Sequence, residues 1–308
     1  MTKTVWVFPG QGSQVLGMGQ ELVDKTSAPA EFVKAAQAKF EQAEDILGWS
    51  VLDICQNQEE KLFRTLYTQP CLYVIESILA DFLLKQDRHP NLVAGHSLGE
   101  YVALYVARVF DFETGLRLVK RRAELMDSAS DGMMAALIGF DREELENQID
   151  QTPDVVLAND NNSAQVVISG KPEPVQQFLS QIKAKRKTPL KVSGAFHSPL
   201  MAEAATEFQA VLESVPFADA QVPVLSNVEP IPAVEASILK DRLQRQMTGK
   251  VRWREISLQI IAEGIEQIVE VGPGKVLTGL MKRTCADLSL DNISSPAQVK
   301  TLSLVTGN

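Results

Sequence analysis

The sequence predicts an α/β protein, in which a parallel sheet is covered by helices on both faces and is interrupted by a smaller inserted unit. Short apolar segments alternate with longer amphipathic segments as far as Asp131, which is the pattern of parallel strands joined by helices. After Asp131 the order changes to strand, helix, strand, strand, helix, strand. The chain has 308 residues, 45% of them hydrophobic and 22% charged, which is enough to give both parts a buried core.

The first part begins with a short buried strand. Residues 5–8 are apolar, so we expect this strand at residues 4–8; it runs into a glycine-rich turn at residues 9–14, and a second strand is expected at residues 92–94. Pro70 suits the first turn of a helix, because proline lacks the N–H group that would be unpaired there. Apolar residues recur at helical spacing between and after these strands, and we expect helices over residues 30–47, 70–84, 98–106 and 112–126.

The inserted unit is expected to be a subdomain of its own. Its strands are predicted at residues 133–139, 155–159, 165–169 and 190–192, and its helices at residues 142–149 and 172–182. This order is that of the split βαβ, or ferredoxin-like, unit. The sequence therefore predicts a small ferredoxin-like subdomain at residues 132–193, inserted into a large subdomain that comprises residues 1–131 and 194–308.

The large subdomain resumes with a helix over residues 198–215. Ser198 and Pro199 suit its N-cap and its first turn. Later strands are expected at residues 222–225 and 268–271, and the second is followed by a Gly-Pro-Gly turn and another helix.

Composition excludes several classes of function. A net charge of −9 and a pI near 5.0 argue against nucleic acid as the main partner. Glu76 and Asp81 interrupt the longest apolar run and no secretory signal precedes the first strand, so we expect a cytoplasmic protein without a membrane span. We also expect a monomer with no metal or cofactor. The 3 cysteines are too scattered for a disulfide framework or a zinc site, and we expect them to be buried: Cys55, Cys71 and Cys285.

The candidate nucleophile is Ser97, in the GxSxG motif at residues 95–99. A serine between two glycines at a strand-to-helix turn sits in a tight bend that exposes its hydroxyl group for attack on a carbonyl. The backbone N–H groups at the helix start can then stabilise the oxyanion that forms. The alternative interpretation is a helix start that is merely flanked by glycines.

A nucleophilic serine needs a base, and the chain has 3 histidines. His89 lies in a polar connection and suits a solvated loop. His96 is adjacent to Ser97, so its side chain points away from that serine, although it can line the same pocket. His197 lies at the junction between the inserted unit and the following helix, which is a favourable place for a pocket wall, and it remains the candidate base. The alternative is a histidine that caps the helix or packs in the core.

No acid is an evident third member of a Ser-His-acid triad. Hydrolases with GxSxG carry this acid between the serine and the histidine, where the chain has Asp131, Asp154 and Asp160, and none has a distinctive context. A backbone carbonyl group could orient the imidazole instead, and the sequence would not reveal it, because every residue has a carbonyl group. A serine esterase or thioesterase that uses one of these aspartates is an alternative function.

Arg122 is a candidate for binding the substrate. On the predicted helix it shares a face with Leu118, Leu125 and Met126, which places a guanidinium group among apolar residues. Its planar fork matches a carboxylate with two parallel hydrogen bonds, so a free carboxylate on the substrate is a natural partner. The alternative is a structural salt bridge with an acid of the protein.

Together these motifs resemble those of the bacterial malonyl-CoA:acyl carrier protein transacylases, a family that also supplies the acyltransferase domains of polyketide synthases. The resemblance covers nearly the whole chain, and it is carried by residues 8–14, 67–70, 95–101, Arg122, residues 196–198 and residues 270–274. It implies an α/β-hydrolase-like body, which agrees with the parallel sheet predicted above.

The resemblance also implies roles for individual residues. Ser97 would attack the malonyl thioester and His197 would take its proton, while the backbone N–H groups of Gln11 and Leu98 would form the oxyanion hole. Arg252 falls where the family uses a main-chain carbonyl group to hold the histidine.

Arg122 falls at the family's carboxylate-binding position. The malonyl-serine ester must survive until a thiol arrives, so pairing with Arg122 would both select the acyl group and fix it. Phe196 matches the family's pattern for malonyl rather than methylmalonyl units. His96 would line the pocket, and so would Asn162, for which a turn residue is the alternative.

The substrates implied are malonyl-CoA and acyl carrier protein, used in ping-pong order to supply fatty acid biosynthesis. A trans-acting acyltransferase of a polyketide synthase is an alternative, and a non-catalytic carrier-binding protein is disfavoured by the intact motifs. Because such carrier proteins are acidic, we expect a local basic rim drawn from Lys183, Lys185, Arg186, Lys187, Lys282 and Arg283.

Overall fold

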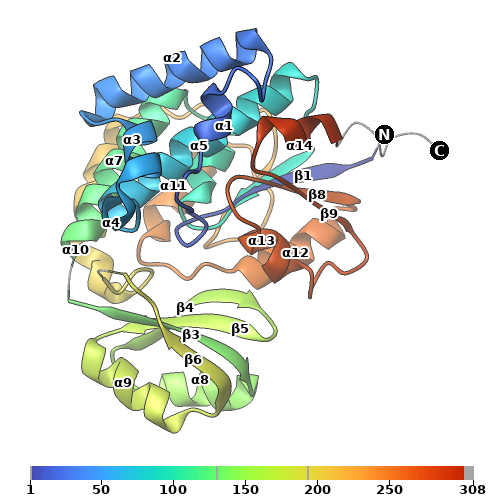
Figure 1. Cartoon of the computed structure of the whole chain (residues 1–308). Coiled ribbons are helices and arrows are strands. Elements are labelled where there is room, and N and C mark those ends of the chain that lie inside the picture. The colour runs from blue at the N-terminus through green and yellow to red at the C-terminus, as the bar shows by residue number, and fades with distance from the viewer. Residues whose placement is uncertain (1, 130, 193, 302–308) are drawn as a thin grey trace.

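The computed structural model describes residues 2–129, 131–192 and 194–301, which form two parts that are each built on one sheet (Figure 1). The larger part has a five-stranded sheet whose strands are all parallel, and the smaller part has a four-stranded antiparallel sheet. The predicted α/β class is therefore confirmed. In spatial order, the parallel sheet consists of β7 (Val224–Leu225), β2 (Leu92–Gly95), β1 (Thr4–Phe8), β8 (Gln267–Val271) and β9 (Ser289–Ile293).

Helices surround the parallel sheet. They are α1 (Gln20–Val23), α2 (Ala30–Leu47), α3 (Val51–Asn57), α4 (Glu59–Leu62), α5 (Thr65–Lys85), α6 (Gly99–Val106), α7 (Phe112–Ser128), α10 (Ala202–Ser214), α11 (Ala236–Gln246), α12 (Trp253–Ala262), α13 (Val276–Met281) and α14 (Pro296–Thr301), together with the 3₁₀ turn η1 (Pro199–Met201). None of the helices in the described ranges combines the length and the apolar character needed to cross a bilayer.

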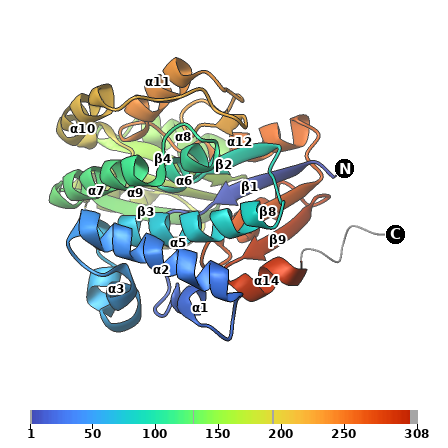
Figure 2. The same cartoon turned by 90° about the horizontal axis from the view of Figure 1, so that it is seen from above.

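Side chains that alternate along β1 enter two different cores. Trp6 and Phe8 pack in the core shared with α2, α5 and α7, whereas Val5 and Val7 pack with α12 and α13 on the other face. This alternation follows from the two-residue period of a strand, and it explains why a central parallel strand is apolar throughout. Figure 2 shows α2 and α5 lying side by side along the sheet.

Several boundaries differ from the prediction. α5 begins at Thr65, so Pro70 lies inside it rather than at its start, because the extensive burial of this helix outweighs the one backbone hydrogen bond that proline cannot donate. The segment predicted as a helix from residue 198 starts as η1, capped by the Ser198 hydroxyl group, and becomes α-helical at Ala202. The predicted strand at residues 222–225 is limited to β7, and β9 was not predicted because its edge position admits polar residues.

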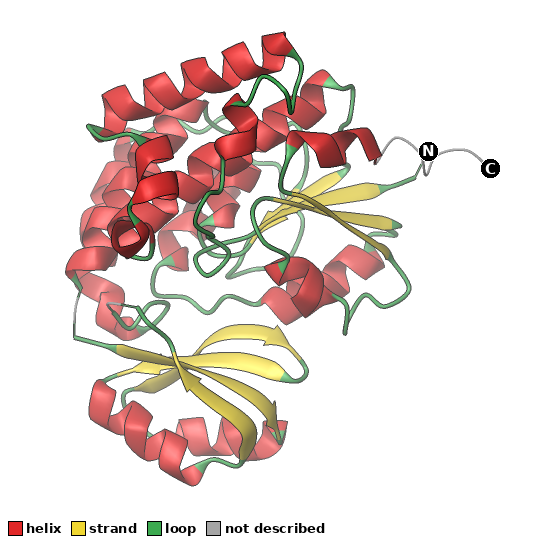
Figure 3. Cartoon of the chain, viewed as in Figure 1, coloured by secondary structure: helices red, strands yellow, loops and turns green. Residues whose placement is uncertain are grey.

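The smaller part has its own hydrophobic core. Its elements are β3 (Met133–Phe140), α8 (Arg142–Asp150), β4 (Val155–Asn162), β5 (Gln165–Gly170), α9 (Pro172–Gln181) and β6 (Ala184–Pro189), and its strands lie in the order β4-β5-β3-β6. Figure 3 shows both helices on the sheet face that points away from the larger part. The strand predicted at residues 190–192 is wrong: β6 is the preceding charged segment, which an edge strand tolerates because it pairs only with β3.

The two parts are joined along β4 as well as by the chain connections. The Asp160 N–H group donates to the Val251 carbonyl group at 2.9 Å, and the Val251 N–H group donates to the Ala158 carbonyl group at 2.8 Å. The buried Asp160 carboxylate pairs with Arg142 of the smaller part at 2.9 Å and with Arg254 of the larger part at 3.0 Å. Asp160 therefore links the sheet of the smaller part to the start of α12 in the larger part.

Candidate active site

Ser97 lies at the sharp turn between β2 and α6, and its φ of +52° is in the left-handed region. A non-glycine residue held there costs ~1–3 kcal/mol, a strain that clusters at functional sites. The flanking glycines are required by close backbone approach. A Cβ atom on Gly95 would lie 1.8 Å from the carbonyl carbon of Gly99, and one on Gly99 would lie 2.0 Å from the carbonyl oxygen of Phe8.

Asn227, after β7, holds this turn from outside. Its side-chain oxygen accepts a hydrogen bond from the Ser97 N–H group at 2.7 Å, and its side-chain nitrogen donates to the Gly95 carbonyl group at 2.6 Å. Both bonds go to the backbone of the strained turn, so Asn227 fixes the direction of the Ser97 side chain. The sequence analysis did not identify this residue, which lies in no distinctive motif.

His197 meets Ser97 across the junction of the two parts. Its Nε2 atom lies 2.8 Å from Ser97 Oγ, and its Nδ1 atom lies 3.0 Å from the Gln246 carbonyl oxygen and 3.1 Å from that of Gly249. Because carbonyl groups only accept hydrogen bonds, Nδ1 carries the proton and Nε2 is free to accept one from the serine hydroxyl group. Burial, and then the positive charge of Arg122, lower the pKa of His197 to about 3, so the imidazole is neutral at neutral pH.

The carbonyl groups that hold His197 are not that of Arg252, and the expectation for this residue is wrong. The Arg252 N–H group donates to the Asn227 carbonyl group at 3.0 Å, and its guanidinium group pairs with Glu255. The histidine is instead held at the end of α11 and in the turn that follows it. Sequence spacing identified the right segment, but the residue whose carbonyl group points inward depends on how the chain bends there.

None of the candidate aspartates makes a hydrogen bond to His197 within the described ranges. Asp154 is exposed and pairs with Lys171 at 2.9 Å, whereas Asp160 is buried between Arg142 and Arg254. Asp131 lines a separate hollow beside η1 and α10. The Ser97–His197 pair is therefore completed by backbone carbonyl groups rather than by an acid.

Arg122 lies beside this pair and is fully buried. Its Nη1 atom donates to Gln69 Oε1 at 2.8 Å, and its Nη2 atom donates to Gln246 Oε1 at 3.0 Å and to Ser97 Oγ at 3.1 Å. No carboxylate of the described residues forms an ion pair with it. Burial lowers the pKa of Arg122, but a guanidinium group stays charged at any physiological pH. The structural salt bridge considered above is thus absent, and the charge is available to an anion.

A cavity of about 410 Å³ connects these groups and lies between the two parts. The larger part supplies Ser97, Arg122 and His197, and the smaller part closes the opposite side with side chains from its sheet. The predicted residues that line the cavity are Gln11, His96, Ser97, Leu98, Arg122, Phe196 and His197. His96 contacts the smaller part, with its Nε2 atom 2.9 Å from Asn161 Oδ1.

Asn162 does not line this cavity, and the expectation that it would is wrong. Its side-chain oxygen accepts from the Ala164 N–H group at 2.9 Å, and its side-chain nitrogen donates to the Leu280 carbonyl group at 3.1 Å. It therefore stabilises the hairpin between β4 and β5, as the turn alternative proposed. Asn159 and Asn161 line the cavity instead.

Gln11 and Leu98, the predicted oxyanion-hole donors, both line the cavity. Leu98 is the N-cap residue of α6, and Gln11 lies in the turn after β1. N–H groups at a helix start have no acceptor within the helix, so the Leu98 N–H group is free for a ligand. The Gln11 side chain is held by the Thr65 hydroxyl group at 3.0 Å, which fixes the turn that carries its backbone.

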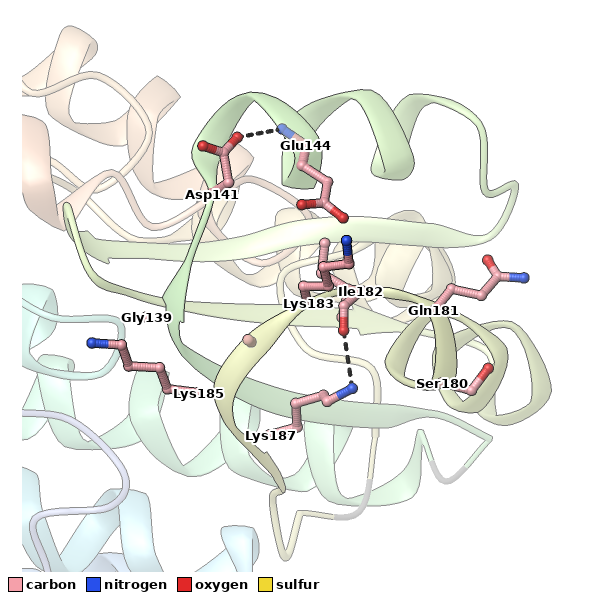
Figure 4. A pocket seen from close by; sticks show the side chains of 10 residues that line it. Gly139, Asp141, Glu144, Ser180, Gln181, Ile182, Lys183, Lys185 and Lys187 are labelled. Carbon is pink, nitrogen blue, oxygen red and sulfur yellow. Dashed lines mark hydrogen bonds between the residues drawn. The ribbon is translucent and has the colours of Figure 1, made fainter.

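A second hollow lies on the smaller part, at the far end of its sheet (Figure 4). It is lined by Asp141, Glu144 and several lysines of the segment around β6. The ammonium group of Lys187 is already hydrogen-bonded there, because its Nζ atom donates to the carbonyl groups of Leu179 and Ile182. This hollow contains no histidine, so it offers no counterpart to the Ser97–His197 pair.

Comparisons with known proteins agree with this geometry. The Acyl transferase domain family matches residues 5–304, which is almost the entire chain. The chain belongs to this family. The acyl transferase is 55% identical to the malonyl CoA-acyl carrier protein transacylase of Synechocystis sp., over 94% of this chain and 97% of that protein.

Solved structures give the same result. The crystal structure of a malonyl-CoA:ACP transacylase from Synechocystis sp. superposes on this acyl transferase with a TM-score of 0.93 at 54% identity, covering 97% of this chain and 99% of that one. A malonyl-transacylase solved in complex with a type II PKS acyl-carrier protein superposes with a TM-score of 0.90 at 36% identity, covering 97% of this chain and 98% of that one.

Sequence reasoning missed several residues around the site. Gln69 and Glu100 lie inside motifs that were recognised, and both are buried polar residues in helices that otherwise read as apolar. A polar residue in an otherwise apolar helix is a signal from which both could have been predicted. Gln246 and Asn227 are in segments without a motif, and only the fold brings them to Ser97 and Arg122.

Proposed function

We propose that this chain transfers a malonyl group from malonyl-CoA to the phosphopantetheine thiol of an acyl carrier protein. The observation that carries the proposal is Arg122, a buried guanidinium group that lies 3.1 Å from the candidate nucleophile Ser97 and forms no ion pair with a carboxylate of the described residues. A cation in that position selects an acyl group that itself bears a carboxylate. The names of the relatives support the same substrates.

The first half-reaction loads the enzyme. Ser97 Oγ attacks the thioester carbonyl carbon while His197 Nε2 takes the hydroxyl proton, and the oxyanion is stabilised by the N–H groups of Gln11 and Leu98. When the tetrahedral intermediate collapses, the carbon–sulfur bond breaks and His197 returns the proton to the leaving thiolate. The product is a malonyl ester on Ser97 and free coenzyme A.

The second half-reaction uses the same groups in reverse. His197 takes the proton of the carrier's thiol, the sulfur attacks the ester carbonyl carbon, and Ser97 regains its proton as it leaves. Two substrates that present the same phosphopantetheine thiol can therefore use one site in turn. Arg122 holds the malonyl carboxylate throughout, which fixes the ester in the cavity between the two half-reactions.

Phe196 gives a basis for selecting malonyl over methylmalonyl groups. Its ring lines the cavity next to His197 and is buried. Because the site is closed on its other side by the smaller part, an extra methyl group must compete with this ring for space. Such a difference of one methyl group is worth about 1–3 kcal/mol.

We also propose the predicted architecture and setting in their finer form. The sheet order β4-β5-β3-β6 supports a ferredoxin-like subdomain at residues 132–193, and the Ser97 turn on a parallel sheet supports an α/β-hydrolase-like body at residues 1–131 and 194–308. We propose a cytoplasmic monomer that supplies fatty acid biosynthesis without acting on nucleic acid or membranes. Service to a polyketide pathway is the alternative, and carrier proteins of both kinds would distinguish them.

The carrier is proposed to dock on a basic rim beside the cavity. Lys282 and Arg283 are exposed directly after α13, whose Leu277 and Leu280 line the cavity. On β6, Arg186 pairs with Ile138 and so shares the sheet face of Ala136, another lining residue. Lys183, Lys185 and Lys187 line the far hollow instead, so fewer basic residues border the cavity than the sequence predicted (Figure 4).

Mass spectrometry of the protein mixed with malonyl-CoA or acetyl-CoA tests the function. We expect a malonyl adduct on Ser97 that is discharged by a holo-carrier protein, little acetyl adduct, and loss of the preference in Arg122→Ala. Steady release of free malonate that is faster than carrier loading would identify a thioesterase instead. Equal malonyl and acetyl labelling of the unmodified protein would contradict the role of Arg122.

A further inference from the structure

Glu100 is a buried carboxyl group that the mechanism above does not use. It lies in the first turn of α6, is 1% exposed, and lines no part of the cavity surface. Its Oε2 atom accepts hydrogen bonds from Gln246 Nε2 at 2.7 Å and from the Asn227 N–H group at 3.2 Å. Burying a carboxylate is unfavourable unless hydrogen bonds or a nearby cation compensate it, so its partners indicate what it does.

Gln246 connects this carboxylate to the substrate-binding guanidinium group. Its Nε2 atom donates both to Glu100 and to the Ser97 carbonyl group, the latter at 2.9 Å, while its Oε1 atom accepts from Arg122 Nη2 at 3.0 Å. Gln246 is fully buried, and its own backbone carbonyl group accepts from His197. One residue thus contacts the proposed nucleophile, base and carboxylate binder.

Glu100 and the Ser97 carbonyl group together favour one orientation of the Gln246 amide group. A carboxylate can only accept hydrogen bonds, so it selects the orientation in which the amide nitrogen points toward it and the amide oxygen points toward Arg122. With the amide reversed, two donors would face each other at Arg122 and two acceptors would face each other at Glu100. The Glu100 carboxylate therefore helps to orient the hydrogen bond between Gln246 and Arg122, although it does not contact Arg122 itself.

The Gln246 amide group also separates the Glu100 carboxylate from the Arg122 guanidinium group. Burial raises the pKa of Glu100 and lowers the pKa of Arg122, and the attraction between the two groups across Gln246 opposes both shifts. The two charges are not in contact, so the fork of Arg122 is not occupied by an internal ion pair. A direct salt bridge would have to be broken each time a malonyl carboxylate binds.

We propose that Glu100 is a positioning residue, which acts through the Gln246 amide to keep the Arg122 guanidinium group oriented for the malonyl carboxylate. This inference rests on the proposed function and adds a determinant of its selectivity. It predicts that the carboxylate at position 100 affects malonyl binding more than the chemical step.

The test compares the malonyl and acetyl kinetics of Glu100→Gln with those of the unmodified protein. We expect the KM for malonyl-CoA to rise about tenfold with a smaller change in kcat, and the ratio of malonyl to acetyl loading on Ser97 to fall about tenfold. Gln246→Glu, which places a carboxylate directly against Arg122, should lower malonyl loading further. This second variant also keeps the test valid if Glu100→Gln does not fold.

A double variant separates positioning from a simple need for buried charge. Glu100→Gln combined with Gln246→Glu keeps one buried carboxylate but moves it into contact with Arg122, so malonyl selectivity should stay low. Recovery of normal selectivity in the double variant would overturn the proposal. Glu76→Gln is the matched control: Glu76 is equally buried on α5, its oxygen atoms have no hydrogen-bond partner in the described residues, and selectivity should be unchanged.

The outcomes also separate this inference from the proposed function. If the unmodified protein forms no malonyl adduct on Ser97, the function itself is wrong. If the unmodified protein is selective and both single variants keep its KM and its loading ratio, only the role of Glu100 is wrong. A fall in kcat that is equal for malonyl and acetyl groups, together with a lower melting temperature, would indicate a purely structural role and would also overturn the inference.

Discussion

Arg122 Nη2 lies 3.1 Å from Ser97 Oγ, and both atoms face the cavity that separates the two sheets. The hydroxyl group can accept this hydrogen bond while donating its proton to His197 Nε2 at 2.8 Å. A cation at that distance also favours the developing alkoxide, so Arg122 can assist the nucleophile before a substrate carboxylate arrives.

Asn227→Ala should weaken the Ser97 turn. The substitution removes two hydrogen bonds to the backbone of a strained segment, so we expect the free energy of unfolding to fall by about 1–3 kcal/mol. We expect kcat for malonyl transfer to fall with it, because the Ser97 hydroxyl group loses its fixed direction. Chemical denaturation and steady-state kinetics check both parts, and an unchanged kcat would contradict the second.

The stability of the protein should depend on pH in part through the protonation of His197. The pKa of this residue is about 3 in the folded protein against an ordinary value of about 6.5, so the unfolded chain takes up the proton first as the pH falls. Stability contributed by the neutral imidazole is therefore complete above pH ~6.5 and is lost toward pH ~3, by at most ~1.4 kcal/mol per pH unit.

His197→Gln should flatten this dependence. Urea denaturation at several pH values between about 4.5 and 7 would measure the free energy of unfolding of both proteins. His96 also has a pKa lowered by burial and stays in both, so the difference between the two slopes isolates His197. Parallel slopes would show that His197 is not a buried neutral base.

Phe196→Ala should relax the choice of acyl group. Removal of the ring makes room for an α-methyl group, so we expect the preference for malonyl-CoA over methylmalonyl-CoA, measured as a ratio of kcat/KM values, to fall by about 10- to 100-fold. Arg122 is retained, so acetyl-CoA should remain a poor substrate. A variant that accepted acetyl-CoA and methylmalonyl-CoA equally well would point to general damage of the site.

Charge reversal on the proposed rim should affect only the carrier. Lys282→Glu with Arg283→Glu should raise the KM for carrier protein about tenfold at low salt while the burst of Ser97 acylation by malonyl-CoA is kept. Lys183→Glu with Lys187→Glu is the matched control, because these lysines line the far hollow. Equal effects of the two pairs would indicate a loss of general charge steering rather than a docking rim.

Asn162→Ala should lower stability without changing selectivity. The residue holds the hairpin between β4 and β5 and contacts the Leu280 carbonyl group, so we expect a loss of about 1–3 kcal/mol in the free energy of unfolding. The ratio of malonyl to acetyl loading should be that of the unmodified protein. A changed ratio would indicate that Asn162 contacts the acyl group after all, which would contradict its place in the hairpin.

Features that depend on local chemistry could be predicted from the residues alone. Alternating apolar strands and amphipathic helices predicted the α/β class, and the glycines around Ser97 predicted a turn that only residues without a Cβ atom can form. The apolar neighbours of Arg122 on one helical face predicted a guanidinium group turned inward, and it is buried. In each case the signal lies within a few residues of the position that it predicts.

The contacts between residues that are distant in the sequence could not be predicted in this way, because they depend on how the whole chain packs. Gln246 contacts four residues because α11 ends against the start of α6: Ser97, Arg122, His197 and Glu100. No motif in the segment around residue 246 predicts these contacts. The same reason explains the errors at Arg252 and Asn162, since the direction of a single carbonyl or amide group depends on how each chain segment bends and packs. Local sequence fixes the residue types that chemistry needs, whereas their convergence on one cavity is a property of the packed fold.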